Sequence, residues 1–105
     1  MKALPKRIRV LNLTFKIKWL DETTHSAAEA YGFCCYDTQT IGITERLEKD
    51  QMADVILHEI IHALYFAMGL KEDSDEERVA HGISAGLCTV FKSNPKFFKW
   101  WSDLL

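Results

Sequence analysis

Apolar and polar residues alternate over two short stretches near the N-terminus, Arg7–Val10 and Thr14–Trp19, as they do in half-buried strands. Leu11 and Asn12 lie between the two stretches and are suited to a turn. The pattern therefore predicts a β-hairpin. Its core-facing side chains are expected to be Ile8, Val10, Phe15, Ile17 and Trp19.

A second pair of β-rich stretches, Tyr31–Tyr36 and Thr40–Thr44, is separated by only three residues. A loop of that length is usual in a hairpin, so we predict a second antiparallel pair. The polar residues between the two hairpins, 21–30, indicate a loop or a short helix.

The longest helical pattern runs from Lys49 to Met68 and is apolar on nearly all sides, which predicts a buried helix. Gly69 is placed to end it. A second helix is predicted over 75–92, with Ser74 as N-cap and Glu77 completing a capping box. Its residues at core spacing are Val79, Ala80, Ile83, Leu87 and Val90.

Asn94 and Pro95 break the chain before a last amphipathic helix, expected over 96–105. This helix is rich in aromatic residues. We expect it to pack over the core, because a small domain needs the buried area. If exposed instead, it is a candidate surface for a protein partner or, as the lesser alternative, a helix that lies on a membrane surface.

Length and composition describe one small domain covering residues 1–105, with 48% hydrophobic and 27% charged residues. A net charge of −2 argues against a nucleic-acid partner, and no apolar run is long enough to span a membrane. Three cysteines cannot all pair within the chain. We therefore expect a cytoplasmic protein with reduced thiols.

The most informative motif lies inside the long helix, where His58 and His62 are separated by one helical turn and Glu59 follows the first histidine. Two imidazoles four residues apart can reach one zinc ion without bending the helix. A glutamate beside such a site can act as general base toward a water molecule that zinc activates. The competing interpretation is a core helix whose polar residues are satisfied by ordinary hydrogen bonds.

A catalytic zinc needs a third protein ligand, and the acidic start of the next predicted helix supplies candidates. Glu76 shares the predicted inward stripe and is our first choice. Glu77 lies about 100° around the helix and stays open as an alternative. His81 is the rival, either as a ligand itself, as a partner of a ligand, or as a stabiliser of the oxyanion. Tyr31, Tyr36 and Tyr65 are the other candidates for the oxyanion.

These elements, in this order, resemble the minimal gluzincin peptidases related to the ImmA/IrrE group, especially small versions encoded by phages and prophages. The likeness covers nearly the whole chain and includes Leu57–Leu64, Ile83–Leu87 and Asn94-Pro95. It implies zinc, metallopeptidase activity, His58 and His62 as ligands, Glu59 as base and a downstream glutamate as third ligand. The chain has no room for the extra domains of larger relatives that cleave repressor-like regulators.

The resulting expectation is a small α+β, zincin-like domain, in which the hairpins form an antiparallel or mixed sheet packed on the two helices. It would hydrolyse peptide or protein substrates, and either strand of the second hairpin could hold the peptide by strand addition. Two alternatives stay open. One is a protease similar to the SprT group with His81 as third ligand, and the other is a non-catalytic, zinc-stabilised binding or regulatory module.

Overall fold

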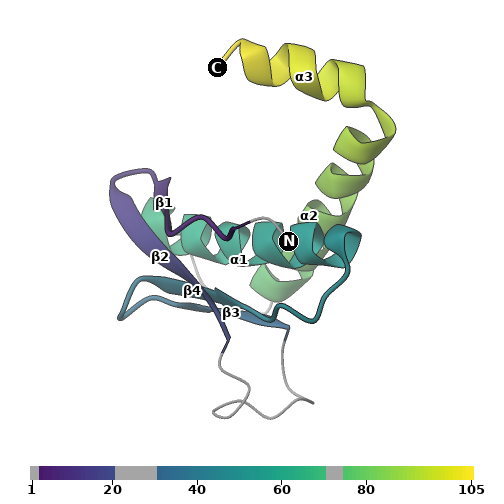
Figure 1. Ribbon diagram of the computed structural model, residues 1–105. Helices are drawn as coiled ribbons and strands as arrows, with labels where there is room; N and C mark the ends of the chain where they lie inside the picture. The colour runs from purple at the N-terminus through teal and green to yellow at the C-terminus, as the bar shows by residue number, and fades with distance from the viewer. Residues whose placement is uncertain (1–2, 21–30, 71–74) are drawn as a thin grey trace.

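The computed structural model describes residues 3–20, 31–70 and 75–105, and these form an α+β domain with a four-stranded mixed sheet and three helices (Figure 1). The elements in chain order are β1 (Arg7–Val10), β2 (Leu13–Trp19), β3 (Gly32–Cys35), β4 (Thr40–Ile43), α1 (Lys49–Met68), α2 (Glu76–Ser93) and α3 (Pro95–Asp103). The strand order is β1-β2-β4-β3. The predicted fold class is confirmed at this level.

Both predicted hairpins are present, because β1 pairs with β2 and β3 pairs with β4 in antiparallel fashion. Leu11, in the first turn, has a positive φ of 55°. Val10 and Phe15 are buried as expected, whereas Ile8, Ile17 and Trp19 are only partly buried.

The two hairpins join through a parallel contact between β2 and β4, with Ile17 opposite Ile41. This contact makes the sheet mixed and encloses β4, whose four residues are all buried. The expectation that either strand of the second hairpin could accept an added peptide is therefore wrong for β4, which has a neighbour on both sides. Only β3, at the edge of the sheet, keeps that geometry.

Helix α1 crosses one face of the sheet and has the predicted bounds (Figure 1). Its buried Ala63 joins Val10, Phe15 and Ile41 in the hydrophobic core. Gly69 ends the helix with φ 67°, and its N–H donates to the carbonyl of Phe66. This is the left-handed C-terminal stop that the sequence predicted.

Helix α2 packs on α1 through a face that overlaps the predicted inward stripe only at Glu76 and Ala80. The buried residues are Glu76, Ala80 and Ser84, of which the last two are fully buried. The predicted core positions other than Ala80 are wrong, since these side chains are 36–49% exposed: Val79, Ile83, Leu87 and Val90. Small residues allow the two helices to approach closely, and this rotation turns the larger apolar side chains outward.

Ser74, the predicted N-cap, lies outside the described residues. Asp75 occupies the N-cap position of α2 and makes no side-chain capping bond to the helix.

Helix α3 contradicts the expectation that the aromatic tail covers the core, because none of its residues is buried. The chain turns at Asn94 and α3 lies beyond the end of α2, away from the sheet (Figure 1). Phe98 and Trp101 contact Phe91 of α2, with ring centroids 4.5 and 5.9 Å away. Within the described part of the chain, no helix combines the length and apolarity needed to cross a bilayer.

Candidate metal centre

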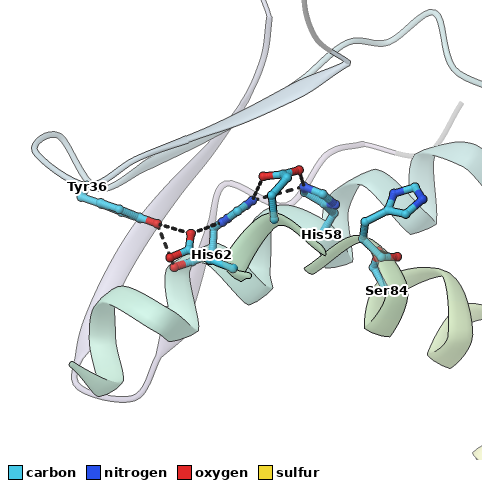
Figure 2. Close-up of polar contacts among 7 residues, drawn as sticks. Tyr36, His58, His62 and Ser84 are labelled. Atoms are coloured by element: carbon cyan, nitrogen blue, oxygen red, sulfur yellow. Dashed lines mark hydrogen bonds and ion pairs between the residues drawn. The ribbon is translucent and has the colours of Figure 1, made fainter. Parts of the chain in front are cut away.

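The two histidines of α1 lie side by side on the helix face that is turned toward α2 (Figure 2). His58 and His62 bring their Nε2 atoms within 3.2 Å of each other. Both side chains are largely buried, at 17% and 13% exposure. The predicted spacing of one helical turn therefore aims both imidazoles at one point.

A third donor comes from Glu77, in the first turn of α2. Its Oε1 lies 2.7 Å from Nε2 of His58, and its Oε2 lies 2.9 Å from Nε2 of His62. The ligand atoms of these three residues all lie within 4.8 Å of one another, so the group could hold a metal ion. The geometry thus favours Glu77 over Glu76, the reverse of the order that we inferred from the sequence.

Glu76 contacts the opposite side of the same imidazole. Its Oε2 lies 2.5 Å from Nδ1 of His62 and accepts a hydrogen bond from the hydroxyl of Tyr36 at 3.3 Å. The same hydroxyl also donates to the backbone carbonyl of His62 at 3.2 Å (Figure 2). The ring of Tyr36 stacks on Phe66 of α1, with centroids 4.7 Å apart.

An ionised carboxylate can only accept a hydrogen bond, so Glu76 requires the proton of His62 to reside on Nδ1. The lone pair of Nε2 then points toward His58 and Glu77. Carboxylates commonly orient metal-binding histidines in this way and raise their basicity. The other oxygen of Glu76, Oε1, is buried and has no hydrogen-bond partner among the described residues.

The converging hydrogen-bond acceptors of these side chains fit a bound cation. With Nδ1 of His62 protonated, Nε2 of His62 and Oε2 of Glu77 are two acceptors only 2.9 Å apart. A neutral His58 carries a single ring proton, so at most one proton can lie between these acceptors. Because converging acceptors repel without a positive charge between them, a divalent ion relieves the conflict.

Glu59, the predicted base, is buried next to this group. Burial raises the pKa of its carboxyl from 4.5 to about 7, His62 opposes the rise and Glu77 adds to it. Close approach of the edge strand contributes to this burial. A Cβ added to Gly32 would lie 3.3 Å from Oε2 of Glu59 and only 2.8 Å from Cγ1 of Val55. Glycine at this position lets β3 lie directly against the carboxylate.

Two hollows of about 410 Å³ each flank the group and share Gly32, His58, Glu59 and Glu77. One hollow extends toward Tyr31 and the second toward Tyr36. Both are bounded by β3 and by the two helices. A polypeptide lying along β3 would therefore pass both the histidines and the buried carboxylate.

His81 lies near the site but outside the ligand group. Its ring centroid is 6.4 Å from that of His58, and the two rings meet edge to face. The side chain is exposed and lines the same hollow as Tyr31. The backbone carbonyl of His81 accepts a hydrogen bond from Ser84 (Figure 2).

Sequence reasoning selected the histidines and Glu59 but missed the roles of Gly32 and of Tyr36 as the partner of Glu76. The signal for Gly32 was a glycine inside a strand, which often marks a close approach. No local pattern identifies Tyr36, because its partners are 26 and 40 residues away.

No family model, curated protein or solved structure matches the chain.

Proposed function

We propose that this protein is a zinc-dependent endopeptidase with a zincin-like domain, similar to the minimal ImmA/IrrE-related peptidases. The observation that carries the proposal is the convergence of His58, His62 and Glu77 on one point beside the buried Glu59. Two imidazoles and one carboxylate form a donor set typical of catalytic zinc, which keeps a fourth position open.

His58, His62 and Glu77 would hold the ion, and Glu76 with Tyr36 would orient His62. When bound, zinc polarises a peptide carbonyl and lowers the pKa of water. Glu59 would take a proton from the attacking water and pass it to the leaving amine, which is general base and then general acid catalysis.

The substrate in this proposal is an extended peptide that adds to β3, the edge strand beside the site. The two hollows give room for side chains on either side of the bond that is cleaved. Tyr36 is engaged with Glu76, so His81 and Tyr31, which line the groove, are better placed to stabilise the oxyanion.

The test is metal analysis and peptidase assay of the purified protein beside the Glu59→Gln variant. Wild type should contain about one zinc ion per chain and cleave an unfolded protein substrate. The variant should keep the zinc and lose hydrolysis by a factor of at least about 100, because the base has lost its charge. A correctly folded wild type without zinc would end this proposal, whereas zinc without hydrolysis would support the non-catalytic module.

A further inference from the structure

The outer face of α2 carries an apolar stripe that no described residue covers. Val79, Ile83, Leu87 and Val90 are 36–49% exposed, although they recur at helical spacing and face the same side. A Cβ added to either of the glycines beside them, Gly82 or Gly86, would meet no atom within 4 Å. We call the four apolar residues and the two glycines the α2 seam.

We propose that the α2 seam pairs with the same seam of a second copy of this chain, forming a two-fold symmetric dimer. In such a contact the two α2 helices run antiparallel, and each meets the same surface of the other copy. In an antiparallel contact the valine at one end of each seam lies opposite the valine at the other end of its partner, with Ile83 and Leu87 between them. Gly86, near the middle, would let the two backbones approach.

Charge does not oppose the pairing of two identical seams. The charged residues of α2 are Glu76, Glu77, Arg78 and Lys92, and the last three lie more than about 100° around the helix from Ile83. Glu76 is buried and engaged with His62. Two copies of the seam can therefore meet without placing like charges opposite each other, which would otherwise oppose self-association.

The exposed area is sufficient for a stable dimer. A compact chain of 12.1 kDa exposes about 6,000 Å² by the usual scaling of surface with mass, and this chain exposes 7,726 Å². Helix α3, which contacts α2 through Phe91, adds apolar side chains that are 40–90% exposed: Phe97, Phe98, Trp100, Trp101, Leu104 and Leu105. Seam and α3 together present on the order of 900 Å², close to one partner's share of a standard interface.

The dimer would leave the candidate metal centre accessible. Glu77 and His81, which line the groove, lie at least about 100° around α2 from Ile83. The seam and the groove therefore occupy different sides of α2.

The experiment compares the full chain with Ile83→Lys and with the matched control Met68→Lys, by light scattering during gel filtration at about 100 µM. Met68 is a similarly exposed apolar residue, at 57%, but belongs to α1. Wild type and the control should run as dimers of twice 12.1 kDa. Ile83→Lys should raise the dimer dissociation constant at least about 100-fold, because the two-fold axis brings the lysines together.

Circular dichroism spectra should coincide for all three proteins, since Ile83 is not part of the core. Gly86→Leu is a second test that does not depend on charge. A leucine there meets open space within one chain and should leave the folded monomer intact, but it should weaken the dimer by blocking close approach.

A monomeric wild type at this concentration would overturn the proposal. So would a dimer that survives both Ile83→Lys and Gly86→Leu, since the interface would then lie elsewhere. A monomer that binds vesicles of anionic phospholipid would assign the aromatic surface of α3 to a membrane and would equally reject the second copy.

Discussion

Neighbouring glutamates contact the histidine pair from two sides, and mutation of each should affect zinc binding differently. We predict that Glu77→Ala removes a ligand, whereas Glu76→Gln only disturbs the orientation and basicity of His62. Tyr36→Phe is a matched control that keeps the aromatic ring and removes the hydroxyl that holds Glu76.

The magnitudes follow from the contacts. Structural zinc sites with four ligands release about 10–16 kcal/mol, so one ligand corresponds to roughly 3–4 kcal/mol, or a loss of about 10²–10³ in affinity. Replacing a carboxylate partner of a metal-binding histidine costs about 10- to 100-fold, and glutamine, which still accepts a hydrogen bond, belongs at the lower end. Loss of the Tyr36 hydroxyl, whose bond to Glu76 is 3.3 Å long, should cost less than about 10-fold.

Affinity is measured by competition with a chromophoric zinc chelator at constant pH. Cobalt substitution gives a second readout, because the visible spectrum reports coordination number and ligand type. Glu76→Gln and Tyr36→Phe should keep the wild-type cobalt spectrum at saturating metal, and Glu77→Ala should change it.

The opposite order of effects would refute this assignment. If Glu76→Gln changed the cobalt spectrum and reduced affinity more than Glu77→Ala, Glu76 would be the ligand. Equal, small effects of all three variants would show that neither carboxylate holds the ion.

Further predictions concern glycines and thiols. Gly32→Ala should destabilise the fold by about 1–3 kcal/mol in urea unfolding and reduce peptidase activity, since its Cβ overlaps α1 and the backbone of β4. Gly82→Ala should stabilise the fold by about 0.5–1 kcal/mol, because alanine is the better helix former and its Cβ meets open space. Burial raises the pKa of the Cys34 thiol from 9.0 to about 12. The preference of the folded state for the protonated thiol therefore stabilises the fold fully below pH 9, and this stabilisation is lost as the pH rises toward 12. Cys34→Ala should therefore lose less stability than wild type between about pH 8 and about pH 10, and equal losses would contradict the shift. Hydrogen bonds from Thr38 lower the pKa of the Cys35 thiol, so iodoacetamide should label it before Cys34, as mass spectrometry of digests can show.

Local patterns were sufficient for the strands and for α1. Alternation over β1 and β2 and a glycine stop after Met68 depend on residues that are neighbours in sequence, and the bounds of α1 came out as predicted. The convergence of His58 and His62 is equally local, because helical geometry alone places residues four apart on one face.

The rotation of α2 was not predictable in the same way. Its apolar residues have a clear helical period, but of these only Ala80 is buried against α1, together with Ser84, while the larger apolar side chains are exposed. A period identifies which residues share a face and does not identify the face that a neighbouring helix selects. If the α2 seam pairs with a second copy, the stripe marks a buried face of the dimer.

Spacing along the chain was enough to establish the type and order of the elements, the histidine pair and the acidic start of α2. Only the packing of α2 on α1 shows that Glu77 faces Nε2 of His62 and that Glu76 faces Nδ1. The two side chains differ by about 100° in direction, and that angle acquires meaning only when packing has set the rotation of α2 against α1.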